Sequence, residues 1–137
     1  AILDEPRRLL KSSGQLAVCA ADFSKTSVAI GDGDPLQTCV EVWLEGNVTD
    51  RWLSPRLPGL LKSKGFEVKI FKGHNRVDIT GISTGPNRVK MGANAMVNRG
   101  QNGEAADEAL KQECQRRIDD GQFYAALPFV TAIAHKA

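Results

Sequence analysis

The chain has 137 residues, of which 42% are hydrophobic and 25% charged, and its formal net charge is +2. These values are typical of one soluble domain whose core is large enough to fold without metal ions or disulfides. No apolar run approaches the roughly 20 residues that a membrane-spanning helix requires, so the sequence predicts no transmembrane segment.

The chain starts at Ala1 and shows no signal peptide. Removal of a leader and removal of an initiator methionine both produce such a start. Secretion is therefore one prediction for the compartment, and the cytoplasm is the alternative.

The first third of the chain predicts an arm, a hairpin and a strand. Residues 1–13 form an N-terminal arm or a short helix, because Pro6 interrupts a longer one. Residues 15–31 hold two apolar runs around turn-type residues, which predicts a β-hairpin. A glycine- and aspartate-rich loop follows at 31–35. Residues 37–45 alternate between apolar and polar, which predicts a half-buried strand.

The middle of the chain predicts a helix, a second hairpin and a loop. The helix starts near Ser54 and ends at Gly65. Residues 66–80 alternate on either side of turn-type residues 72–75, which indicates a hairpin. Residues 81–103 contain five glycines and four asparagines, which predicts a long flexible loop.

Residues 104–120 have acids in the first turns and an apolar stripe at four-residue spacing, which predicts a helix. A closing strand follows at 129–133. From residue 37 onward, the order is that of a ferredoxin-like split βαβ (β-α-β-β-α-β) core. The predicted fold is therefore α+β: two main helices pack on an antiparallel sheet, a β-hairpin precedes the core, and residues 1–137 form a single domain. An edge strand of this sheet could pair with a second copy and give a homodimer.

The chain has three cysteines and no C-x-x-C or Cys/His ligand spacing, so we expect no metal site. No other motif indicates a cofactor. A disulfide between Cys19 and Cys39 is one expectation if the protein is secreted. Three buried, reduced thiols are the alternative.

The charges are unevenly distributed along the chain. Residues 51–99 hold ten lysines and arginines against two acidic residues, whereas both flanking segments are acidic. A basic segment of this kind attracts phosphates, anionic head groups or an acidic protein surface, unless the acidic ends fold back onto it. The predicted binding residues are Lys62, Lys64, Lys69, Lys72, Arg76, Arg88 and Lys90.

His74 is the candidate for acid–base chemistry. It lies between Lys72 and Arg76, so a metal-independent ribonuclease could use it as a general base beside a phosphate clamp. A solvated turn residue is the alternative. The octamer 64–71 resembles the RNP1 segment of RNA-recognition motifs at four positions, which implies single-stranded RNA binding. Phe66 and Phe71 differ in strand parity, so only one of them could stack on a base.

The segment Gly121-Gln122-Phe123-Tyr124-x-Ala126 follows a helix that carries Cys114. It resembles part of the KP6-type fungal killer toxins, which are small secreted α/β proteins with a fold shared by effectors of plant pathogens. The resemblance implies a secreted toxin or effector that binds a target without turnover, and it carries over no catalytic residue.

Three functions are therefore predicted. The first is a secreted, non-enzymatic interaction protein that acts through the basic segment on a protein or another anionic partner. The second is a nucleic-acid-binding protein that uses the same basic residues, and the third is the ribonuclease that uses His74.

Overall fold

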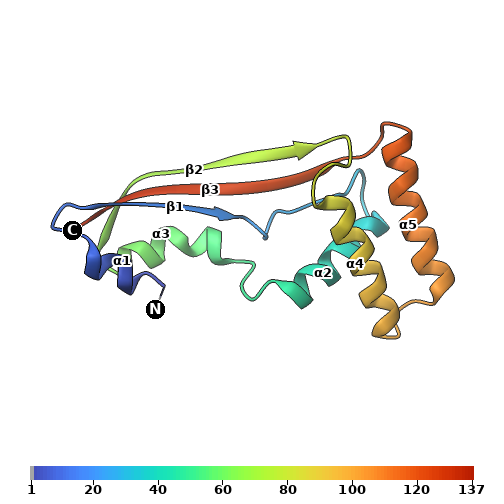
Figure 1. Cartoon of the computed structure of the whole chain (residues 1–137), viewed down its shortest axis with the longest axis horizontal. Helices are drawn as coiled ribbons and strands as arrows, with labels where there is room; N and C mark the ends of the chain where they lie inside the picture. Colours follow the sequence, from blue (N-terminus) through green and yellow to red (C-terminus); the bar gives the residue numbers. More distant parts are fainter. Residues whose placement is uncertain (1) are drawn as a thin grey trace. The chain divides into compact units, whose positions relative to one another are not determined.

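The structure, a computed structural model, describes residues 2–137. Within this range it has five helices and three strands (Figure 1). Their order is α1 (Asp4–Leu9), β1 (Gln15–Ala21), α2 (Pro35–Asn47), α3 (Leu53–Ser63), β2 (Phe66–Asp78), α4 (Gly85–Asn98), α5 (Glu104–Asp119) and β3 (Ala125–Lys136). No helix in the described range is long and apolar enough to cross a membrane.

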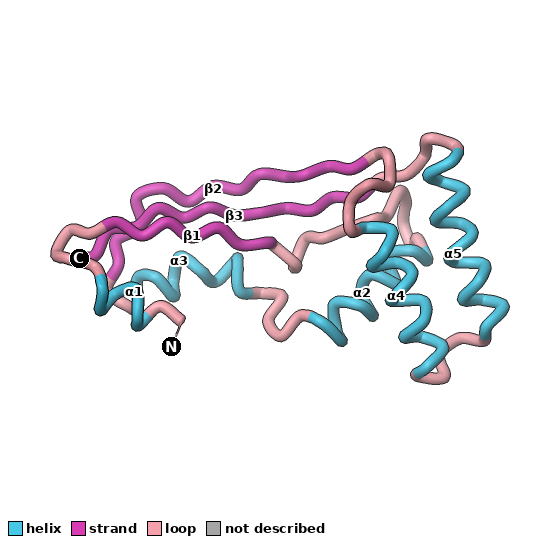
Figure 2. The backbone as a smooth tube through the Cα atoms, in the orientation of Figure 1, coloured by secondary structure: helices cyan, strands magenta, loops and turns pink. Residues whose placement is uncertain are grey.

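The three strands form one open antiparallel sheet in the order β1-β3-β2 (Figure 2). Strand β3 is central, with Gln15 of β1 opposite His135 and Ala21 opposite Phe129. Strands β1 and β2 are therefore the two edges of the sheet. The predicted α+β class is confirmed.

The chain divides into two compact units. The first holds the N-terminal residues up to Ser24, residues Asp50–Asn75 and residues Pro128–Ala137. Helices α1 and α3 lie on the same face of its sheet (Figure 1). The core beneath them consists of Leu57, Leu61, Phe66, Val130, Ala132 and Ala134. Alternate residues of the strands point into this core because side chains along a strand alternate between its two faces.

The second unit holds residues Lys25–Thr49 and Arg76–Leu127. Helices α2, α4 and α5 pack on one another there. Helix α2 buries Leu36, Val40 and Leu44, which are four residues apart and so share one face of the helix. The ends of β2 and β3, at 76–78 and 125–127, also belong to this unit.

Two predicted strands are wrong. Residues 37–45 lie in helix α2, which begins where the Asp34 side chain accepts a hydrogen bond from the backbone N–H of Leu36. The cap and Pro35 at the first helical position favour the helix, although Val40, Val42 and Leu44 also fit a strand period. The second strand of the predicted hairpin at 15–31 is reduced to an isolated bridge between Ser27 and Ala126, because β1 pairs with β3 instead.

Residues 66–80 do not form a hairpin. Residues Phe66–Asp78 are one continuous strand, so the turn-type residues 72–75 are extended. Residues 81–103 contain helix α4 where a long flexible loop was expected. The ferredoxin-like order is consequently wrong in detail, because the described range has three strands where that core has four. The helices predicted at 54–64 and 104–120 and the closing strand are confirmed as α3, α5 and β3.

Candidate interaction site

The seven basic residues predicted to bind a partner fall in both units. Lys62 lies on α3 and Lys64 caps its C-terminus, while Lys69 and Lys72 lie on β2; these four belong to the first unit. Arg76, Arg88 and Lys90 belong to the second unit. The candidate site therefore consists of residues of the first unit.

Some of these charges already have partners. The Nζ of Lys64 lies 2.7 Å from Oδ1 of Asp4, and the Nζ of Lys69 lies 2.6 Å from Oε1 of Glu67. The Lys69 hydrogen bond lowers the pKa of Glu67, so this carboxylate stays ionised. Both pairs are exposed, and such pairs contribute about 0–1 kcal/mol, so an incoming anion can compete for either lysine.

Arg88 is held differently. Its guanidinium lies 4.8 Å from the centre of the Trp43 ring, a cation–π contact within the second unit. Burial lowers the pKa of Arg88. Arg88 therefore has a packing role between α4 and α2, which makes it a poorer candidate for partner binding than the exposed lysines.

The middle of β2 is exposed on both sides. Residues 69–77 are all exposed, and no acidic residue interrupts them. Their side chains include the apolar Ile70, 46% exposed, and Phe71, 38% exposed. We call residues 69–75, the part that belongs to the first unit, the basic edge. In the described part of the chain, no residue forms an ion pair with Lys72.

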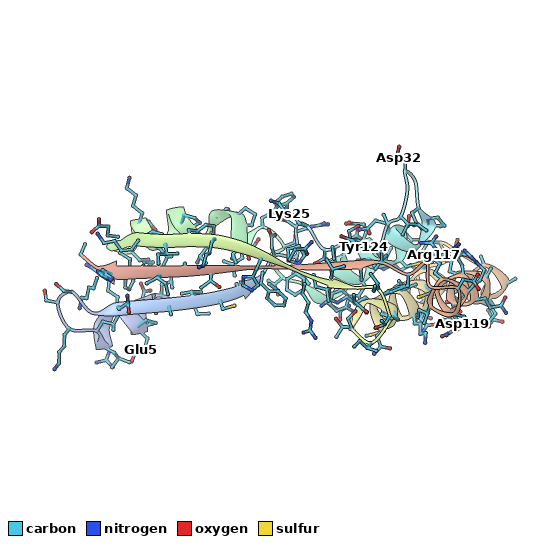
Figure 3. All side chains as sticks on the ribbon, turned by 90° about the horizontal axis from the view of Figure 1, so that it is seen from above. Glu5, Lys25, Asp32, Arg117, Asp119 and Tyr124 are labelled. Atoms are coloured by element: carbon cyan, nitrogen blue, oxygen red, sulfur yellow. The ribbon has the colours of Figure 1, made fainter. Side chains whose placement is uncertain are left out.

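A groove runs beside the start of this strand. Its volume is about 600 Å³. One wall is formed by Pro58, Gly59 and Lys62 of α3, and the other by Phe66, Glu67 and Val68 of β2. Figure 3 looks onto the sheet with α3 behind it, along the β2 edge. We call this feature the α3–β2 groove. The sequence did not predict this groove. Sequence patterns predict the helix and the strand separately, but they do not predict how the two pack against each other.

Phe66 and Phe71 face different environments. Phe66 is 3% exposed and belongs to the core, whereas Phe71 is exposed on the basic edge. The parity argument is therefore confirmed: of the two aromatic rings in the octamer that resembles RNP1, only Phe71 is available to a ligand.

His74 lies on the basic edge and stacks on Phe129, with ring centroids 5.7 Å apart and planes inclined by 9°. Among the described residues, no hydrogen bond holds its imidazole against an acid or a base. His74 is therefore held by a ring contact. No described residue orients its imidazole through a hydrogen bond, as is usual for a general base.

The three cysteines are free in the structure. Cys19 belongs to the first unit and Cys39 to the second, so the disulfide expected between them stays a prediction. Cys19 is exposed on β1, while Cys39 and Cys114 are buried in the second unit. Burial raises the pKa of Cys39 to about 11, which keeps this thiol protonated and unreactive. Residues 2–137 also contain no group of three or more histidine, cysteine, aspartate or glutamate side chains that could hold a metal ion.

The segment that resembles KP6-type toxins forms the passage from α5 to β3. Gly121 has a φ of +69°, and Phe123 and Ala125 are buried. These residues therefore act in the turn and in packing, and none of them contributes to the basic edge.

No protein-family model matches the chain, and a search of curated proteins found no match.

Proposed function

We propose that this chain is a small, non-enzymatic interaction protein that binds an anionic partner through the basic edge. One observation carries the proposal: residues 69–75 are exposed without interruption, carry Lys69 and Lys72, and include no carboxylate. The proposed binding surface is therefore one strand of the first unit and not the whole basic segment 51–99.

An acidic polypeptide is the partner that this surface fits best. Ile70 and Phe71 add apolar area beside the lysines. Interfaces combine apolar contact, which supplies affinity, with complementary charge, which supplies association rate and specificity. A second copy of the chain fits less well, because two such edges would bring lysines together and like charges on paired strands are destabilising.

The resemblance to KP6-type toxins supports a secreted toxin- or effector-like role for this interaction protein. The precursor gene tests it. We expect a leader ahead of Ala1 that is removed from the mature protein. An initiator methionine placed directly before Ala1 would contradict secretion through a cleaved leader.

Single-stranded nucleic acid is the second candidate partner, favoured by the exposed ring of Phe71 between Lys69 and Lys72. Aromatic side chains that stack on bases and cations that contact phosphates are the usual combination in such sites. The ribonuclease hypothesis for His74 would add cleavage to this binding.

The experiment compares two labelled probes, a short oligoglutamate and an oligouridylate of the same length, by fluorescence anisotropy over a salt series. We expect the oligoglutamate to bind and the double variant Lys69→Glu/Lys72→Glu to weaken binding about tenfold or more. The matched control is Lys11→Glu/Lys25→Glu, because both lysines are exposed outside the basic edge.

Equal losses in the two double variants would show that only net charge matters and would contradict the assignment to the basic edge. Tighter binding of the oligouridylate, with a steep decrease as salt rises, would favour the nucleic-acid function. Cleavage of that probe by the wild type, lost in His74→Ala, would favour the ribonuclease.

A further inference from the structure

The outer edge of β2 has backbone groups that no strand of the first unit covers. The carbonyl of Gly65 accepts a hydrogen bond from the N–H of Ala137, at 3.0 Å. A trans peptide bond directs the following N–H, that of Phe66, to the opposite side, away from β3. Successive strand residues alternate, so the N–H and C=O of Val68 also point outward. These groups can pair with an additional strand.

The α3–β2 groove lies beside this edge. Its walls are mainly apolar, with Pro58 and Gly59 on the helix and Phe66 and Val68 on the strand. A volume of about 600 Å³ is within the range of ligand-binding clefts. A strand added to β2 would place every second side chain on the same face as Phe66 and Val68, and therefore toward this groove.

The positively charged side chains beside the groove favour an occupant with negative charge. Lys62 lies in the helix wall and forms no ion pair with any described residue. Lys72 adds a second positive charge farther along the strand. Gly65 and Ala137 also line the groove, and Glu67 is the one side-chain carboxylate among the lining residues; it pairs with Lys69 at 2.6 Å. A partner with carboxylates is therefore favoured over a neutral or basic one.

From these three observations we infer that the partner is an extended polypeptide segment with alternating apolar and acidic residues, which adds to β2 as a further strand. Its apolar side chains occupy the α3–β2 groove, and its acidic side chains point to the opposite face of the strand, where Lys69 lies. Lys62 and Lys72 lie on the groove face and attract the acidic segment by their charge. Main-chain hydrogen bonds give such strand addition its affinity, and pockets for alternate side chains give it specificity. The inference rests on the proposed function, because it specifies the partner of the same edge.

The test uses a labelled synthetic peptide of alternating glutamate and valine. Two analogues carry N-methyl groups on the odd or on the even residues, so each lacks the N–H groups of one edge. Because an added strand pairs with β2 along one edge, we expect at least one analogue to bind about tenfold more weakly or worse.

A second experiment uses a variant whose side chain fills the groove. A Cβ added at Gly59 meets no atom within 4 Å, so Gly59→Phe can be accommodated on α3 while its ring projects into the groove. We expect this variant to bind the parent peptide about tenfold more weakly. Ser63→Phe, at an exposed position of the same helix outside the groove walls, is the matched control and should bind as the wild type does. Thermal unfolding confirms that both variants are folded.

The outcomes separate the two proposals. If both N-methyl analogues and Gly59→Phe bind like their parents while Lys69→Glu/Lys72→Glu still weakens binding, strand addition is wrong and the basic edge is retained. If the charge reversal also has no effect, the proposed function itself is wrong. A chain that sediments as a dimer through β2 would mean that a second copy is the occupant instead.

Discussion

Asp34 links the start of α2 to α5 within the second unit. Its carboxylate accepts hydrogen bonds from the backbone N–H of Leu36 and Ile30, each at 3.0 Å. It also accepts two hydrogen bonds from the guanidinium of Arg117, at 2.7 and 3.0 Å. Both side chains are buried. Burial by itself would raise the pKa of Asp34, but the bonds from Arg117 and the two N–H groups lower it below the usual value.

The variant Asp34→Asn should therefore lower the free energy of unfolding by about 3 kcal/mol, because it leaves the buried charge of Arg117 without its main partner. Asparagine can still cap α2 with its one oxygen, but its NH2 group cannot accept the second backbone hydrogen bond, so the variant loses the Arg117 pair together with the bond from Ile30. Urea unfolding followed by circular dichroism measures the difference. The matched control is Asp32→Asn, at the exposed tip of the same loop (Figure 3), which should change stability by less than about 0.5 kcal/mol. Equal stability of the two variants would show that the ion pair is not needed.

Helix α4 is the element that local sequence preferences predict least well. Its glycines and asparagines are poor helix formers, yet residues 85–98 are helical. The reason is packing against α2: a Cβ on Gly92 would lie 1.8 Å from the carbonyl oxygen of Cys39. Glycine is required there because it allows the two helices to approach closely, so tertiary contact outweighs the local preference.

We expect Gly92→Ala to lower the free energy of unfolding by about 3 kcal/mol, since either the helices must separate or the backbone must shift. The control is Gly59→Ala in α3, where an added Cβ meets no atom within 4 Å. This control should raise stability by roughly 0.5–1 kcal/mol, because alanine favours the helix more than glycine does. Chemical denaturation measures both changes, and a Gly92→Ala protein as stable as the wild type would contradict the close approach.

For the whole molecule, the stability of the folded chain depends on pH through three carboxylates whose pKa values are lowered on folding. Hydrogen bonds from Arg116 and Arg117 lower the pKa of Glu113 to about 2. Burial opposes ionisation of Asp78, but hydrogen bonds from Ser83 and Thr80 lower its pKa below the usual value. The pKa of Asp34 is lowered as well. These carboxylates bind protons more weakly in the folded than in the unfolded chain.

Stability should therefore be retained above about pH 5 and should fall as the pH decreases from about 4 toward 2, because the unfolded chain takes up more protons over that window. Urea midpoints measured at about pH 6, 4 and 3 test this. Asp78→Asn should be less stable than the wild type near neutral pH and should show a shallower decrease on acidification. An increase in stability on acidification would contradict the assignment.

Sequence patterns by themselves determined the α+β class, the helices α3 and α5, the strands β1 and β3, and the basic character of the segment 51–99. These features follow from hydrophobic periodicity, helix caps and charge, all of which are local. The candidate site was predicted in part: Lys62, Lys69 and Lys72 were named, whereas the groove beside them was not.

Only the tertiary structure decided the rest, because the deciding contacts join residues far apart in the chain. The segment 37–45 alternates as a strand does, but Leu36, Val40 and Leu44 also have the four-residue spacing of a helix face. The ion pair between Asp34 and Arg117, which are far apart in the chain, stabilises the helix. Residues 72–75 have the composition of a turn but are extended in β2, which pairs with β3. That same pairing makes β2 an edge strand and leaves Lys69 and Lys72 exposed on it.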